Sequence, residues 1–215
     1  MYRRILGGVA AVAFAACFSA SANATVYTNA GGTQSTISPF GSPDTTSYGE
    51  YFTAPGGALD SWTFRSQSVA AVGNLELVVA SWNGTSAVGP ALYVSAPIAD
   101  SGASNEALTF SGINLALTAG QSYIAYMTVA GVAGPVQGAA ISVSSTDVLN
   151  GGGAFDNSNG ANPLTAGNIT WDAPGSVYFT YSATFVPAAV PEPAGAAVLA
   201  FGLIGLGFVR RRPSR

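Results

Sequence analysis

The stretch "SVYFTYSATFV", residues 176–186, decides the fold of this chain, because its residues alternate strictly between two sets. The first set is apolar or aromatic: Val177, Phe179, Tyr181, Ala183 and Phe185. The second set carries a hydroxyl at every position: Tyr178, Thr180, Ser182 and Thr184. Successive side chains of a β-strand point to opposite faces of the sheet, so this alternation predicts an antiparallel strand with one buried face.

Runs of the same kind recur along the chain, separated by clusters of Gly, Pro, Asn, Ser and Asp. They are YGEYFT (48–53), LDSWTFRS (59–66), LELVVASW (75–82), ALYVS (91–95), ALTFSG (107–112), INLALT (113–118), SYIAYMTVA (122–130) and AAISVSS (139–145). Aromatic and β-branched residues dominate these runs, as pleated sheets favour. We therefore expect an all-β body over 25–186, an antiparallel β-sandwich of jelly-roll or Greek-key type, with a closed barrel as the alternative.

The segment "LTAGQSY", residues 117–123, places a glycine turn before a strand that begins near Tyr123. It resembles the tyrosine corner of Greek-key sandwiches, which implies that the Tyr123 hydroxyl bonds back to a nearby backbone group. The alternative is a tyrosine that only packs at the start of a strand. At pattern level, the body also looks like extracellular β-sandwich domains found before surface anchors. Residues 150–167, rich in Gly and Asn, are expected to form a long loop.

The composition excludes several kinds of catalysis, because the chain has no histidine and no lysine. Serine–histidine triads, histidine metal sites and lysine Schiff bases are therefore ruled out, and we expect no metal and no cofactor. Only carboxylates remain, and the candidates Glu50, Asp60, Glu76 and Glu106 have no motif around them. The chain is expected not to be an enzyme, and a carboxylate-dependent glycoside hydrolase is kept as an alternative.

The charge of the body also limits its partners. Between positions 25 and 190, Arg65 is the single basic residue among many acidic ones. Nothing in such a body neutralises phosphate charge, so we expect no nucleic-acid partner.

The first 24 residues have the three parts of a secretory signal peptide. A basic start is followed by an apolar stretch over 5–18, which would form the signal helix, and by a cleavage site framed by Ala22 and Ala24. Cleavage there makes Thr25 the first residue of the exported chain. Cys17 offers an alternative lipoprotein site. Because it is the only cysteine, its removal with the signal peptide would exclude disulfides.

After a short linker, 187–190, the chain ends in the tail 191–215 with an uncharged apolar run over 194–209. As a helix this run is about 24 Å long, against about 30 Å for a hydrocarbon core. It is expected to be a short membrane helix, with the arginines that follow held on the cytoplasmic side.

The order of these parts closely resembles the PEP-CTERM sorting signal of exported proteins in exopolysaccharide-producing Gram-negative bacteria. The residues that carry the resemblance are Val190, Pro191, Glu192, Pro193, Arg210, Arg211 and Arg212. The resemblance implies recognition, and cleavage near Pro-Glu-Pro, by an exosortase-like membrane enzyme. It leaves open whether the tail is removed or stays as an anchor.

Together these features predict a protein that uses the secretion machinery, crosses the inner membrane and reaches the cell surface or extracellular matrix. The leading hypothesis is a structural or adhesive role, with exopolysaccharide as a candidate partner. The alternative is a carbohydrate-binding module, in which Trp82, at the turn Trp82–Thr85, stacks on a sugar ring. Trp62 lies within a strand run and is expected in the core.

Overall fold

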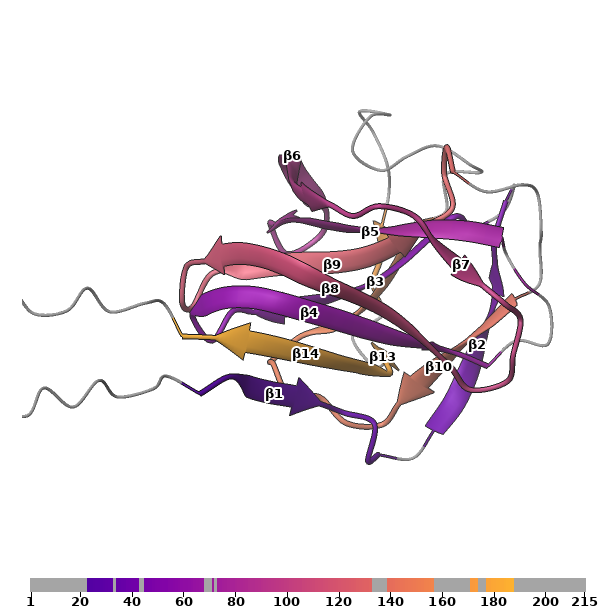
Figure 1. Cartoon of the computed structure of the whole chain (residues 1–215), viewed down its shortest axis with the longest axis horizontal. Coiled ribbons are helices and arrows are strands. Elements are labelled where there is room, and N and C mark those ends of the chain that lie inside the picture. The colour runs from indigo at the N-terminus through magenta and orange to yellow at the C-terminus, as the bar shows by residue number, and fades with distance from the viewer. Residues whose placement is uncertain are drawn as a thin grey trace, which may run out of the picture. The chain divides into compact units, whose positions relative to one another are not determined.

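The computed structural model describes residues 23–32, 34–42, 45–67, 71, 73–132, 139–156, 171–173 and 177–187, which lie in one unit, Asn23–Ala188. Every strand pair in it is antiparallel, and the strands fall into two sheets, here sheet A and sheet B (Figure 1). No helix occurs among the described residues. The predicted all-β, antiparallel class is confirmed, while the predicted signal and tail helices lie outside the described residues.

Sheet A has seven strands in the order β1-β14-β4-β10-β13, with β2 paired to β10 and β8 paired to β4. Its strands are β1 (Thr25–Thr28), β2 (Gln34–Phe40), β4 (Gly57–Ser66), β8 (Glu106–Leu117), β10 (Ala139–Ser144), β13 (Tyr178–Phe179) and β14 (Tyr181–Val186). In Figure 1, β8, β4, β14 and β1 lie in front of the strands of the other sheet.

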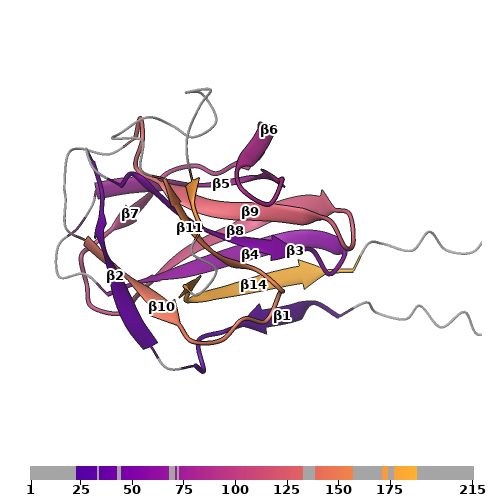
Figure 2. The same cartoon turned by 180° about the vertical axis from the view of Figure 1, so that it is seen from behind.

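Sheet B also has seven strands, in the order β12-β11-β3-β9-β5-β6, with β7 paired to β5 (Figure 2). Its strands are β3 (Ser47–Thr53), β5 (Gly73–Trp82), β6 (Ala87–Val94), β7 (Ile98–Asp100), β9 (Ser122–Thr128), β11 (Gly152–Asp156) and β12 (Trp171–Asp172). One cluster of buried side chains draws on both sheets, including Trp62, Leu108 and Phe185 from sheet A and Phe52 and Leu77 from sheet B. The fold is therefore sandwich-like, with its core between the sheets.

The stretch 177–186 buries Phe179, Tyr181, Ala183 and Phe185, as its sequence predicts. Thr180, from the opposite set, is buried as well, and the stretch is not one continuous strand. The ladder is interrupted at Thr180, between β13 and β14. Side chains from elsewhere bind the backbone at this break. The Asn29 amide donates to the Phe179 carbonyl (2.8 Å) and accepts from the Tyr181 N–H (2.8 Å), and Glu50 Oε2 accepts from the Phe179 N–H (2.8 Å).

Strand β8 joins two runs, 107–112 and 113–118, that the sequence separates. It continues through the junction because Gly112 (φ 69°) and Asn114 (φ 50°) adopt left-handed conformations inside the strand. Both residue types tolerate this region better than others do.

The predicted loop 150–167 is wrong at its start, because Gly152–Asp156 forms strand β11, paired to β3. Residues 157–167 lie outside the described residues. The glycines here serve close approach: a Cβ atom on Gly152 would collide with the ring of Tyr51. The glycine at 152, which suggests a loop in the sequence, instead leaves room for the Tyr51 ring beside the strand.

The predicted tyrosine corner is confirmed. The Thr118 N–H donates to the Tyr123 hydroxyl oxygen at 3.2 Å, five residues back along the chain. Tyr123 is 8% exposed and belongs to the core cluster, so its hydroxyl ties the turn at 118–121 to the start of β9.

Replacing Tyr123 with phenylalanine removes this acceptor and leaves the ring in place. We expect the free energy of unfolding to fall by about 1 kcal/mol, the usual net value of one hydrogen bond, measured by urea unfolding. Tyr27→Phe is the matched control, because its hydroxyl has no hydrogen-bond partner among the described residues and its loss should cost less than about 0.5 kcal/mol. Equal losses from both variants would contradict the corner.

Candidate functional site

Most residues of the two processing signals cannot be placed. Those outside the described residues are Ala22, Val190, Pro191, Glu192, Pro193, Arg210, Arg211 and Arg212. Ala24, which precedes the predicted cleavage point, is exposed just before β1. Among the described residues, none belongs to a helix of the length and apolarity that a membrane span requires.

The two ends of the body lie side by side. Strand β1 pairs with β14 so that Thr25 lies opposite Phe185 and Thr28 opposite Ser182. The first residue after the predicted cleavage site therefore neighbours the last strand before Pro187. The chain therefore begins and ends the body at the same end of sheet A (Figure 1).

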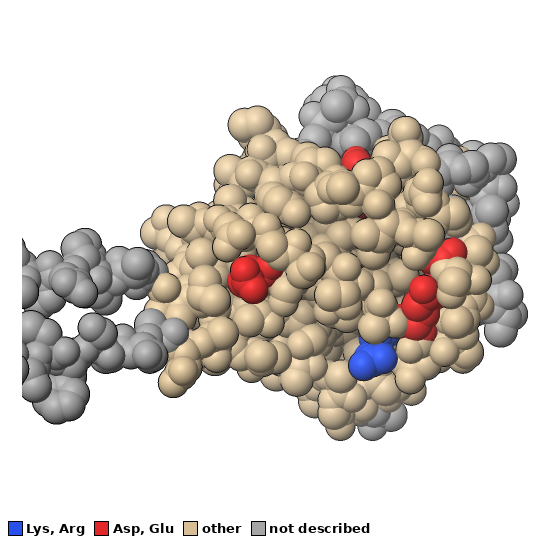
Figure 3. Space-filling view, viewed as in Figure 1, with Lys and Arg blue, Asp and Glu red and all other residues tan. Residues whose placement is uncertain are grey.

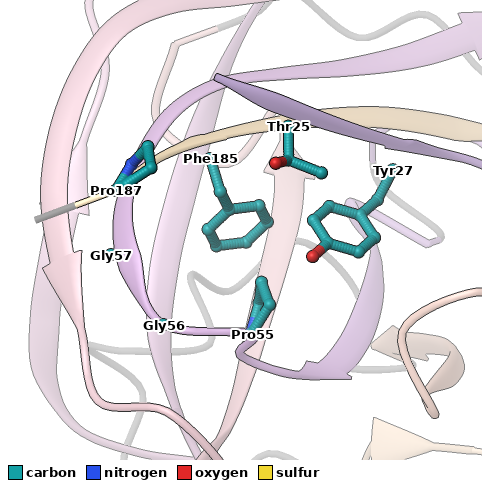
Figure 4. A pocket seen from close by; sticks show the side chains of 7 residues that line it. All are labelled: Thr25, Tyr27, Pro55, Gly56, Gly57, Phe185 and Pro187. Carbon is teal, nitrogen blue, oxygen red and sulfur yellow. The ribbon is translucent and has the colours of Figure 1, made fainter. Parts of the chain in front are cut away.

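A hollow of about 300 Å³ opens at this shared end. It is lined by Thr25, Tyr27, Pro55, Gly56, Gly57, Phe185 and Pro187 (Figure 4). The Tyr27 and Phe185 rings meet edge to face, with their centroids 5.7 Å apart. Gly57 has a φ of 84°, and a Cβ atom there would collide with the Val186 carbonyl oxygen. No lining side chain is charged, so the hollow offers shape and apolar contact but no acid–base chemistry.

Trp82 does not present an open face to solvent, which corrects the expectation of a sugar platform. The predicted turn is present, since Asn83 Oδ1 accepts from the backbone N–H groups of Thr85 (2.9 Å) and Ser86 (2.8 Å). The indole itself is only 6% exposed. The Tyr51 ring stacks on it with centroids 5.3 Å apart and planes 4° apart. The ring face needed for a sugar is therefore already covered.

Trp82 instead belongs to an aromatic cluster on the outer face of sheet B. Trp171 meets Trp82 edge to face at 6.0 Å and Tyr126 at 5.3 Å. The Tyr126 hydroxyl is buried with no hydrogen-bond partner in the part of the chain that the structure describes. Burial, followed by the negative charges of Glu76 and Asp156, raises the pKa of this phenol far above its usual value. It therefore stays neutral, and the cluster is a second, smaller core.

Glu50 is fully buried between the sheets, which is the least expected position for an acid. Its Oε2 accepts a hydrogen bond from the Phe179 N–H, while its Oε1 is buried without a partner among the described residues. Burial raises the pKa of Glu50 well above its usual value; the Phe179 N–H opposes this shift, and the charge of Asp147 adds to it. The raised pKa favours the protonated form of Glu50, which joins sheet B to β13 through the Phe179 N–H.

The other carboxylate candidates do not converge on Glu50 or on one another. Asp60 lies at a bulge in β4, where the register of the β4–β8 ladder shifts. Glu76 is on β5 in the other sheet, and burial raises its pKa. Glu106 begins β8, where it accepts from the Ser101 hydroxyl (2.7 Å) and backbone N–H (3.0 Å). No two of these four form the facing pair that glycoside hydrolysis uses.

The outer face of sheet A carries a regular array of hydroxyl groups, here called the hydroxyl face. One row crosses three strands and comprises Ser182, Thr63 and Thr109. The next row crosses the same strands and comprises Thr184, Ser61 and Ser111. The sequence shows these residues only as outward positions of separate strands. Their alignment depends on strand register, which no local pattern reveals.

Comparison of the chain with protein-family models, curated proteins and solved structures finds no match.

Proposed function

We propose that this protein is an exported component of the cell surface or extracellular matrix with a structural or adhesive role. In this proposal the secretion machinery removes 1–24 during passage through the inner membrane. An exosortase-like membrane enzyme then recognises the PEP-CTERM-like tail, 191–215, and cleaves near Pro-Glu-Pro. The body, 25–186, is the part that acts outside the cell.

The observation that carries the proposal is the pairing of β1 with β14, which puts Thr25 opposite Phe185. The chain therefore joins both processing segments to the body at neighbouring strand ends. Termini that lie close together are common in domains; here they bring both proposed cleavage points to one end of the body, which suits processing at a membrane. Combined with the two terminal motifs, this favours a surface or matrix protein.

We further propose that the sandwich is of jelly-roll or Greek-key type. The first and last strands are neighbours, and β4 pairs with β8 and β14 rather than with β3 or β5. Neighbours in the sheets are thus mostly distant in sequence, as long crossing connections between two sheets require.

The export route can be tested on the protein recovered from the surface or medium of producing cells. We expect its intact mass to correspond to a chain that begins at Thr25 and lacks Arg210–Arg212. A Pro191→Ala, Glu192→Ala, Pro193→Ala variant should keep the full C-terminus and remain with the membrane. A full-length C-terminus in the mature wild-type protein would make the tail a permanent anchor and refute the processing step.

A further inference from the structure

We propose that the hydroxyl face of sheet A binds an extended, neutral polysaccharide chain. This inference goes beyond the export route, because it assigns a ligand class and a surface to the body itself. The surface consists of outward side chains on β14, β4 and β8: Ser182, Thr63, Thr109, Thr184, Ser61 and Ser111. It lies on the opposite side of sheet A from the core, away from Trp82.

The array has a regular spacing set by the sheet. Neighbouring strands lie about 4.8 Å apart, and alternate residues along one strand are about 6.7 Å apart. Thr63 and Thr109 are 3.0 Å apart between their hydroxyl oxygens. The hydroxyls of Ser61, Ser111, Ser182 and Thr184 have no hydrogen-bond partner among the described residues. Donors and acceptors are therefore available along the outer face at intervals set by the strands.

The charge of this face selects the ligand. The body is strongly acidic, yet the two rows contain no ionisable side chain. Asp60 and Arg65 flank the rows on β4, and Glu106 lies at the start of β8, so charged side chains stand at the ends of the rows and none stands within them. Figure 3 shows this side of the molecule with few charged side chains. A neutral polymer fits such a face, whereas the remaining acids of the body repel an anionic one.

The chemistry of the side chains distinguishes a polysaccharide from other partners. A hydroxyl group both donates and accepts hydrogen bonds, so it complements a polymer whose own surface is made of hydroxyls. The cores of protein interfaces are enriched in aromatic residues, methionine and arginine, and the rows have none of these. Arg65 adds donors at the edge, since its guanidinium makes only long contacts among the described residues, with Asn105 at 3.4 and 3.5 Å.

The proposal can be tested with the purified exported protein and microcrystalline cellulose as a neutral, extended probe. We expect the wild type to bind, and the variant Thr63→Val, Thr109→Val, Thr184→Val to bind about tenfold or more weakly. Each lost hydrogen bond contributes about 0.5–1.5 kcal/mol, and about 1.4 kcal/mol corresponds to a factor of ten. Valine keeps the shape of threonine, so a thermal unfolding curve should show an intact fold.

Thr36→Val is the matched control, because Thr36 is an exposed threonine on β2, outside both rows. It should leave binding unchanged. The proposal is overturned if the wild type fails to bind cellulose, if it binds alginate in preference, or if the triple variant binds as well as the wild type. Loss of binding in Trp82→Ala with retention in the triple variant would also overturn it. None of these outcomes depends on how the tail is processed, so the export proposal is tested separately.

Discussion

Replacing Trp62 with alanine should lower the free energy of unfolding by about 3–5 kcal/mol, the usual cost of removing a large buried aromatic ring. The Trp62 side chain is fully buried at the centre of the core. Its ring stacks on Tyr181 with centroids 4.9 Å apart and packs against Phe52 at 5.0 Å. Alanine would leave a cavity where the two sheets meet. Denaturant unfolding followed by circular dichroism measures the loss.

Trp62→Phe separates ring packing from the polar group. Within the described ranges the indole N–H of Trp62 is buried without a hydrogen-bond partner, and an unsatisfied buried donor is costly in the folded state. Phenylalanine removes that donor and still supplies a ring, so we expect a loss of only about 1–2 kcal/mol. Similar losses in both variants would mean that the cavity does not dominate and would contradict the packing argument.

Replacing Glu50 with glutamine should change how stability depends on pH. The pKa of Glu50 is raised in the folded protein, chiefly by burial. The folded chain therefore binds this proton more tightly than the unfolded chain does. In the wild type, stability from Glu50 is complete below its ordinary pKa, near 4.5, and is lost as pH rises toward the raised value. The slope is about 1.4 kcal/mol per pH unit.

Glutamine keeps the oxygen that accepts the Phe179 N–H but does not ionise. We therefore expect the variant to become more stable than the wild type as pH rises from about 5 to 7, with the difference growing by up to about 1.4 kcal/mol per unit. Chemical denaturation at a series of pH values measures this difference. Parallel curves for the two proteins would show that Glu50 does not hold its proton in the folded state.

Glu106→Gln is the control of opposite sign. Burial raises the pKa of the Glu106 carboxyl, but hydrogen bonds from Ser101 and its other neighbours outweigh burial and leave the pKa below its usual value. Stability from Glu106 is therefore present above the ordinary pKa and lost as pH falls. As pH falls, the wild type should therefore lose stability relative to Glu106→Gln. Relative to Glu50→Gln, the wild type should gain stability as pH falls.

The local patterns predict the sheet-forming segments well, because alternation depends only on neighbouring residues. The alternating burial of Tyr181–Val186, the turn after Trp82 and the hydrogen bond of Tyr123 all follow from short stretches of sequence. The break at Thr180 does not, because Asn29 and Glu50 create it from distant positions.

The candidate site is less predictable than the fold for the same reason. The exposure of Trp82 depends on Tyr51, which comes from another strand of sheet B and covers the indole. The alternation of β3 places Glu50 on the buried face. The sequence around Glu50 does not show that its carboxyl binds the distant Phe179 N–H. The hydroxyl rows need the register of three strands, and register is a property of the assembled sheet.

The position of β14 between β1 and β4 has a mechanical consequence. A force applied through both ends of the body would open the β1–β14 ladder one residue pair at a time, starting at Thr25 and Phe185. A force applied through Pro187 alone, with the body held at its surface, acts along the axis of β14. Hydrogen bonds in antiparallel sheets run across the strands, so this load shears the ladders on both sides of β14 together. If the chain is cut before Thr25, as we propose, a load through Pro187 acts on the body in this shear direction.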